Sequence, residues 1–143
     1  MNTMDNCIFC QILAGKIPSS CVYKDELCTA FLDIGPINTG HVLVIPNEHS
    51  SFLSGLDPET GAQIFRVAQR VVQALRSGVV QCDGVNLYLA DGEVAGQEVF
   101  HVHLHVFPRF VGDGFRLHFG PSRGHQPPKA ELDAVADRIR AAI

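Results

Sequence analysis

With 143 residues, 46% hydrophobic and 18% charged, the chain has the size and composition of one globular domain with a hydrophobic core, which excludes a disordered or fibrous protein. Its formal net charge of −4 has the wrong sign for a domain that follows a nucleic-acid backbone. No apolar stretch approaches the ~20 residues that cross a bilayer, and no secretory signal pattern opens the chain, so we expect a cytoplasmic protein without a membrane partner.

The first half of the chain predicts a short helical turn followed by three strands. The turn is expected over residues 7–13, and the strands over 21–25, 28–34 and 41–46, because runs of apolar and β-branched residues alternate there with Gly, Pro, Asn and Asp turns. Strands this close together in the sequence favour antiparallel pairing.

A long amphipathic helix is predicted over residues 57–78. Asp57 can cap its N-terminus, Pro58 suits the first helical position, and Gly78 ends it. One face carries an apolar stripe that should pack on the core. This stripe consists of Ile64, Val67, Ala68, Val71, Val72 and Leu75.

The second half predicts two further strands, over residues 85–91 and 99–108, then an irregular Gly- and Pro-rich loop over 109–128. A second amphipathic helix follows after Pro127 and should pack in the same way as the first. The order of strands, helix, strands and helix predicts an α+β fold with an antiparallel sheet.

The segment HVHLHV, residues 101–106, carries a histidine at every second position. On a strand, His101, His103 and His105 would project from one face about 6 to 7 Å apart. A solvent-exposed polar face or a His-x-His metal pair is the alternative, but three alternating imidazoles on a core strand favour a functional site.

Cys7 and Cys10 have the C-x-x-C spacing that lets two thiolates bind one Zn²⁺. His49 and one histidine of the 101–106 segment can complete a Cys₂His₂ set. Two unrelated free thiols are the alternative. A thioredoxin-like redox motif is disfavoured because no strand precedes it.

The usual phosphate-binding, dinucleotide-binding, serine-hydrolase and zinc-protease motifs are absent from the sequence. A histidine that itself acts as the nucleophile remains as a candidate, since imidazole fills this role when another group fixes its tautomer.

The segment FHVHLHV resembles the signature of the histidine triad family of nucleotide hydrolases and transferases, in its zinc-bearing bacterial-type branch. The blocks CIFCQILAGKIPSSCVYKDE, AFLDIGPINTGHVLVIPNEH and AGQEVFHVHLHVFPRFVGDGF resemble family blocks in the family's order. The resemblance implies a five-stranded antiparallel sheet and a homodimer in which two sheets join through the long helix and a strand. It implies a single domain over 1–143, with its core at about 7–115 and a C-terminal loop and helix at 116–143.

The resemblance also implies the chemistry. His103 would attack the α-phosphorus of a nucleoside phosphoramidate or dinucleoside polyphosphate, forming a nucleotidyl-histidine that water resolves. The ring should donate Nδ1–H to a backbone carbonyl, so that Nε2 keeps its lone pair. Donors to the phosphoryl oxygens are expected from His105, the Gln97 side chain and backbone N–H groups of residues 97–99.

For a purine nucleotide, Asp33 matches the family position that accepts hydrogen bonds from both ribose hydroxyls. Ile8, Phe9, Phe31 and Ile34 match the apolar walls around the base, although each could equally be a core residue. His41 matches a histidine that supports the triad. The full nucleotide-binding set expected is Ile8, Phe9, Phe31, Asp33, Ile34, Gln97, Glu98, Val99, His103 and His105.

In zinc-bearing branches the ligands match Cys7, Cys10, His49 and His101, and the zinc is structural. The chain departs from the family at Glu98, where other branches use Ser or Thr on the leaving-group side, and this carboxylate favours phosphoramidates over polyphosphates.

Two other functions stay open at this stage. One is a nucleotide-binding adaptor with little turnover, and the other is a zinc hydrolase that uses His101 and His103 as ligands. Nucleic acid is not an expected partner, because the chain is acidic and has no appended basic module.

Overall fold

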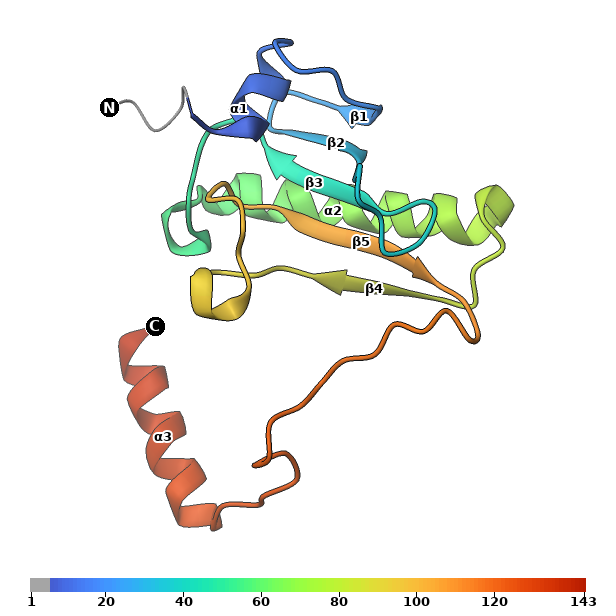
Figure 1. Cartoon of the computed structure of the whole chain (residues 1–143). Helices are drawn as coiled ribbons and strands as arrows, with labels where there is room; N and C mark the ends of the chain where they lie inside the picture. The colour runs from blue at the N-terminus through green and yellow to red at the C-terminus, as the bar shows by residue number, and fades with distance from the viewer. Residues whose placement is uncertain (1–5) are drawn as a thin grey trace. The chain divides into compact units, whose positions relative to one another are not determined.

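The computed structural model describes residues 6–143 and shows a five-stranded, fully antiparallel sheet in the order β1-β2-β3-β5-β4 (Figure 1). Residues 1–5, which the expected domain over 1–143 includes, lie outside the described part. The α+β fold with five antiparallel strands is confirmed. Its strands are β1 (Cys21–Lys24), β2 (Cys28–Leu32), β3 (Val42–Pro46), β4 (Gly84–Tyr88) and β5 (Leu104–Arg109).

The long helix α2 (Pro58–Ala74) covers one face of the sheet. It begins as predicted, because the Asp57 carboxylate accepts a hydrogen bond from the Thr60 N–H at 2.9 Å. A wider turn, Leu75–Val79, extends it, and Gly78 ends it with a φ of 102°. The predicted stripe of α2 packs against alternate residues of the strands, in a core of Cys28, Ala30, Val42, Val44, Ile64, Val67, Ala68, Val71, Leu75, Leu104 and Val106.

The opposite face of the sheet carries the short helix α1 (Ile8–Leu13) over its β2 and β3 strands. Cys7 is its N-cap, and its thiol accepts a hydrogen bond from the Cys10 N–H at 3.5 Å. A second, smaller core lies here, formed by Cys7, Phe9, Phe31, Leu43 and Ile45. Because strand side chains alternate, this is also the face that His103 and His105 share, away from α2.

The predicted strand over 99–108 is shorter than expected, since β5 begins only at Leu104. The His101 N–H bonds to the Val99 carbonyl, and the Val102 N–H bonds to the Ser50 carbonyl, so this lead-in segment is held by a turn and a loop. His101 and His103 therefore precede the strand, and the ring centroids of His103 and His105 lie 4.9 Å apart, closer than the expected spacing of about 6 to 7 Å.

The chain divides into two compact units, one ending at Asp113 and one over Gly114–Ile143. The second unit holds α3 (Lys129–Ala142), whose Leu132, Val135 and Ile139 are 39–57% exposed. Within its own unit this stripe is not packed as that of α2 is, because a lone helix and an irregular loop offer no second layer. The single domain and the homodimer stay predictions.

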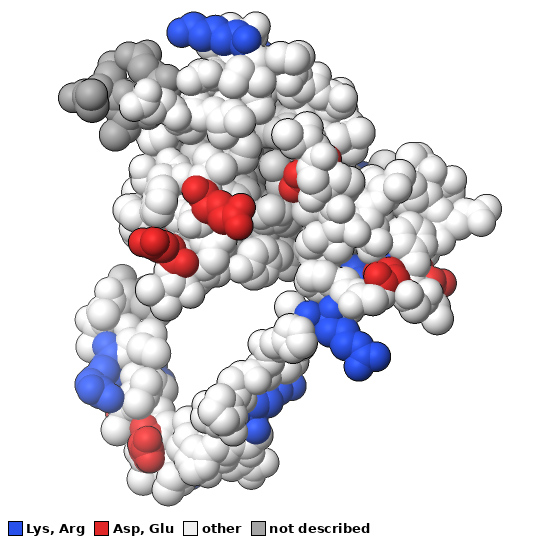
Figure 2. Space-filling model, viewed as in Figure 1, with Lys and Arg blue, Asp and Glu red and all other residues white. Residues whose placement is uncertain are grey.

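Two surface properties bear on partners. Among the described residues no helix has the length and hydropathy needed to span a bilayer. On the face shown in Figure 2, the Lys and Arg side chains of the sheet-containing unit stand apart and form no continuous basic patch.

Candidate active site

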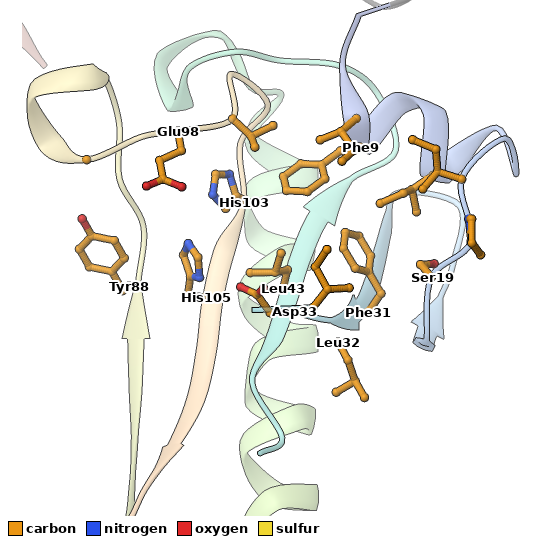
Figure 3. A pocket seen from close by; sticks show the side chains of 17 residues that line it. Phe9, Ser19, Phe31, Leu32, Asp33, Leu43, Tyr88, Glu98, His103 and His105 are labelled. Carbon is orange, nitrogen blue, oxygen red and sulfur yellow. The ribbon is translucent and has the colours of Figure 1, made fainter. Parts of the chain in front are cut away.

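A cavity of about 540 Å³ lies on the sheet face opposite α2, between α1, the ends of β2 and β4, and the loop before β5 (Figure 3). We call it the nucleotide cavity, after the ligand that the family resemblance implies. Its volume lies within the range typical of small-molecule sites. The predicted residues that line it are Ile8, Phe9, Phe31, Asp33, Ile34, Glu98, Val99, His103 and His105.

One wall of the nucleotide cavity is apolar. Phe9 and Phe31 are buried, with their ring centroids 5.6 Å apart in an edge-to-face arrangement. Ile8 and Ile34 stand at the rim, 42% and 97% exposed. The two phenylalanines thus belong to the smaller hydrophobic core and also line the cavity, whereas Ile34 lines the cavity without belonging to a core.

His103 is held in the orientation that a nucleophile needs. Its Nδ1 lies 2.7 Å from the carbonyl oxygen of His101. Because a carbonyl can only accept, Nδ1 carries the proton and Nε2 keeps its lone pair. The Phe9 ring packs edge-to-face against the imidazole at 5.2 Å and limits its rotation. The predicted bond to a backbone carbonyl is present.

His41 and His105 form a second hydrogen-bonded chain. The Ile37 N–H donates to Nδ1 of His41 at 3.1 Å, so the His41 proton lies on Nε2. Nε2 of His41 is 2.9 Å from Nδ1 of His105 and 3.6 Å from the Asp33 carboxylate. Because only the first distance is that of a hydrogen bond, Nε2–H of His41 donates to Nδ1 of His105. His105 must then carry its own proton on Nε2, as a donor at the cavity.

Burial keeps these imidazoles uncharged. It lowers the pKa of His105 to about 4, with smaller contributions from the imidazoles of His103 and His41. Burial also lowers the pKa of His41, against the opposing effect of the Asp33 carboxylate. At neutral pH His105 is therefore a neutral N–H donor at the cavity, and its donation to phosphoryl oxygens stays a prediction.

Replacing His41 by alanine should lower kcat by roughly 10- to 100-fold with little change in KM. The substitution leaves Nδ1 of His105 without its donor and the Ile37 N–H without its acceptor, so the His105 tautomer is no longer fixed. Steady-state kinetics on adenosine phosphoramidate, a substrate of the class that the family resemblance implies, measures the effect. His41→Gln, which keeps an amide donor, should recover part of the rate, and an unchanged kcat in His41→Ala would contradict the role.

Gln97 does not occupy its predicted place. Its side chain is buried and its amide donates to the carbonyls of Ser51 at 2.7 Å and Val99 at 3.1 Å, while its oxygen accepts the Gly92 N–H at 2.7 Å. Both amide hydrogens are thus engaged, and Gln97 does not line the nucleotide cavity. The prediction that this side chain donates to phosphate is corrected: it holds the loop before β5 in place.

Cys7, Cys10, His49 and His101 converge beside the nucleotide cavity, with their four ligand atoms all within 4.8 Å of one another. Nδ1 of His101 is 3.4 Å from Sγ of Cys7 and 3.6 Å from Sγ of Cys10, and Nδ1 of His49 is 3.3 Å from Sγ of Cys10. Tetrahedral zinc separates sulfur and nitrogen ligands by about 3.5 Å. The four residues therefore fit a zinc ion.

The hydrogen bonds that these four residues make with their neighbours are also compatible with a bound zinc ion. Nε2 of His101 lies 2.9 Å from the Pro46 carbonyl and must carry the proton, which leaves Nδ1 free to bind metal. Nε2 of His49 lies 3.4 Å from the Ser51 hydroxyl. Burial is the main cause that raises the pKa of the Cys10 thiol to about 11, and a cation between the ligands would offset that cost. A Zn²⁺ here would tie α1 to the segment that precedes β5.

Tyr88 belongs to the site although its sequence context gave no signal for it. It pairs directly with His105 across β4 and β5, lines the nucleotide cavity, and its ring lies 5.7 Å from that imidazole. Its hydroxyl donates to the Ala95 carbonyl at 2.8 Å. Only the register between the two strands, which the sequence does not reveal, brings Tyr88 to the triad.

The sequence is similar to known proteins over most of its length. A family model described as HIT domain matches residues 14–112. An uncharacterized HIT-like protein of Borreliella burgdorferi is 48% identical over 113 residues, which cover 78% of this chain and 81% of that protein. The adenylylsulfatase HINT3 of Arabidopsis thaliana is 34% identical over 113 residues, covering 76% of this chain and 55% of that protein.

The fold is similar to solved structures. A HIT family protein from Bacillus anthracis gives a TM-score of 0.90 at 39% identity, covering 97% of this chain and 98% of that chain. A Zn-bound histidine triad family protein from Mycobacterium smegmatis gives 0.75 at 38% identity, with 98% and 99% covered. A histidine triad nucleotide-binding protein from Candida albicans gives 0.83 at 27% identity, with 95% and 96% covered. The chain therefore belongs to the HIT domain family, whose members include a nucleotide-binding protein and an adenylylsulfatase.

Proposed function

We propose that the protein hydrolyses nucleoside phosphoramidates or dinucleoside polyphosphates at the α-phosphorus, with His103 as the nucleophile. The observation that carries this proposal is the 2.7 Å bond from Nδ1 of His103 to the His101 carbonyl, which leaves Nε2 unprotonated in a residue that lines the nucleotide cavity.

The reaction would proceed in two displacements. Nε2 of His103 forms a bond to the α-phosphorus while the bond from phosphorus to the leaving group breaks, and a leaving amine takes up a proton from solvent. Water then attacks the same phosphorus, the bond to Nε2 breaks, and a proton returns to solvent. The Nε2–H of His105 would stabilise the charge that develops on the phosphoryl oxygens.

The zinc ion that the four Cys and His ligands fit would be structural in this proposal. The residues brought together as a metal site include His101 and not His103. This grouping favours a nucleophilic imidazole over a hydrolase in which both histidines bind the metal. When bound, the ion supplies rigidity to the segment from which His103 projects.

Asp33 would bind the ribose hydroxyls. It lines the nucleotide cavity between the apolar wall and the triad, and its Oδ1 accepts the Gly35 N–H at 2.8 Å, which fixes the carboxylate. Asp33→Ala should weaken AMP binding by about 10- to 100-fold, since hydrogen bonds to a charged acceptor contribute about 1.5–3 kcal/mol. Calorimetry measures the dissociation constants. Binding of 2′,3′-dideoxy-AMP should be nearly unchanged by the substitution, and an equal loss for both nucleotides would contradict the assignment.

The proposed function is tested by incubation with adenosine phosphoramidate and with diadenosine polyphosphates, followed by identification of the products. Release of AMP from the phosphoramidate supports the proposal. Tight AMP binding without turnover of either substrate class would instead support a nucleotide-binding adaptor.

A further inference from the structure

The nucleotide cavity has an unusual charge for a site that handles a phosphate. Of the 17 described residues that line it, two are acidic, Asp33 and Glu98, and none is Lys or Arg. The imidazoles of His41 and His105 are neutral at physiological pH because burial lowers their pKa values. The net field of the lining side chains is therefore negative.

The two carboxylates lie at different parts of the cavity. Figure 3 shows Asp33 on the side of Phe31 and Leu43, whereas Glu98 lies across the cavity, beside Tyr88 and His103. A nucleotide whose base contacts the apolar wall and whose ribose reaches Asp33 presents its α-phosphorus to His103. The group that departs from phosphorus then extends toward Glu98.

The backbone of Glu98 is held firmly on both sides. Gly96 has a φ of 90°, which other residues rarely adopt, and a Cβ there would make a tight contact of 3.1 Å with the Tyr88 hydroxyl, so the loop passes close to β4 at this glycine. The next residue, Gln97, is fixed by its hydrogen bonds to Ser51, Gly92 and Val99. Glu98 is exposed but projects from a fixed position, which reduces the entropy lost when it binds a partner.

We propose that Glu98 is a specificity-determining residue that selects a leaving group carrying a positive charge, such as an amine with a second, protonated amino group. This inference rests on the proposed hydrolysis at the α-phosphorus. An ammonium near the Glu98 carboxylate is attracted, whereas a carboxylate or further phosphates at that place are repelled. No cationic side chain of the cavity lining offsets either effect.

Three adenosine 5′-phosphoramidates of similar size test the inference. Their leaving amines are ethylenediamine, propylamine and β-alanine, which carry a positive, a neutral and a negative end. For the unaltered protein we expect kcat/KM in that descending order, with about fivefold between successive substrates at low salt, a magnitude suited to an exposed charge. The differences should shrink at high ionic strength.

Glu98→Gln keeps the shape of the side chain and removes the charge, so it should bring the three kcat/KM values to within about twofold of one another. Glu93→Gln is the matched control, because Glu93 is an exposed carboxylate of the same loop that does not line the nucleotide cavity. Its selectivity should equal that of the unaltered protein. Equal kcat/KM values for the three substrates in the unaltered protein, or selectivity that persists in Glu98→Gln, would overturn the inference.

A binding measurement separates this inference from the proposed function. Dissociation constants of the same three compounds are measured by calorimetry with His103→Ala protein, where no turnover is needed. A preference for the cationic compound that Glu98→Gln removes supports the role of Glu98 even if no substrate is hydrolysed. Equal dissociation constants would count against it, whatever the catalytic activity.

Discussion

His103→Ala should abolish turnover of adenosine phosphoramidate, with kcat falling by at least about 10⁴-fold. The substitution removes the only protein atom that bonds to phosphorus in the proposal, and losses of this size follow the removal of a nucleophile in enzymes that react through a covalent intermediate. AMP release in single-turnover and steady-state assays measures the change.

The control for this variant is nucleotide binding. The apolar wall and Asp33 are untouched, so the dissociation constant of AMP should stay within about threefold of the original value. A second readout is the covalent species: acid-labile, alkali-stable nucleotide should remain on the denatured unaltered protein after quenching and be absent from His103→Ala. Appreciable hydrolysis by His103→Ala would show that another group attacks phosphorus.

Removal of zinc should destabilise the protein before it slows the chemistry. The four ligands join α1, the segment after β3 and the segment before β5, so a bound ion cross-links parts of the chain that are far apart in sequence. Bound zinc should add at least about 3 kcal/mol to the free energy of unfolding. Because each kcal/mol changes the Tm of a domain of this size by a few degrees, chelation should lower Tm by about 5–10 °C. Calorimetry with and without chelator measures it, beside metal content by elemental analysis.

Cysteine variants provide the matched comparison for zinc. A Cys7→Ser and Cys10→Ser double variant should have the Tm of the chelated protein and no response to chelator. Cys21→Ser should behave as the unaltered protein, because Cys21 is an exposed thiol outside the four-ligand set. A chelator effect on activity at 25 °C that equals the loss in His103→Ala would contradict a structural role for the metal.

Local sequence signals predicted the elements whose structure is decided locally. Helix α2 begins after the Asp57 cap, and the turn that extends it ends at Gly78, because capping and a positive φ are properties of single residues. The five strands and their antiparallel pairing followed from short turns between β-prone runs. The C-x-x-C spacing suggested that Cys7 and Cys10 bind a metal with His49 and one histidine of the 101–106 segment. The choice of His101 came only from the family resemblance, since residues up to 94 positions apart cannot be paired by periodicity.

The predictions that needed correction depended on contacts between distant segments. The prediction of a strand over 99–108 was too long at its start, because the Val102 N–H donates to the Ser50 carbonyl, which lies outside the sheet. Gln97 was misassigned because its partner Ser51 lies 46 residues away. The apolar residues of α3 repeat with the same periodicity as those of α2. Periodicity shows that one face of a helix is apolar, but it does not show whether another element covers that face.

His101 contributes to two tasks through two different parts of the same residue. Its ring faces the thiols, while its carbonyl oxygen orients the neighbouring imidazole of His103. Every amino acid has that carbonyl, so the orienting bond does not depend on which side chain occupies position 101. Replacement of the His101 ring therefore removes a metal ligand but leaves the carbonyl that fixes the tautomer of His103.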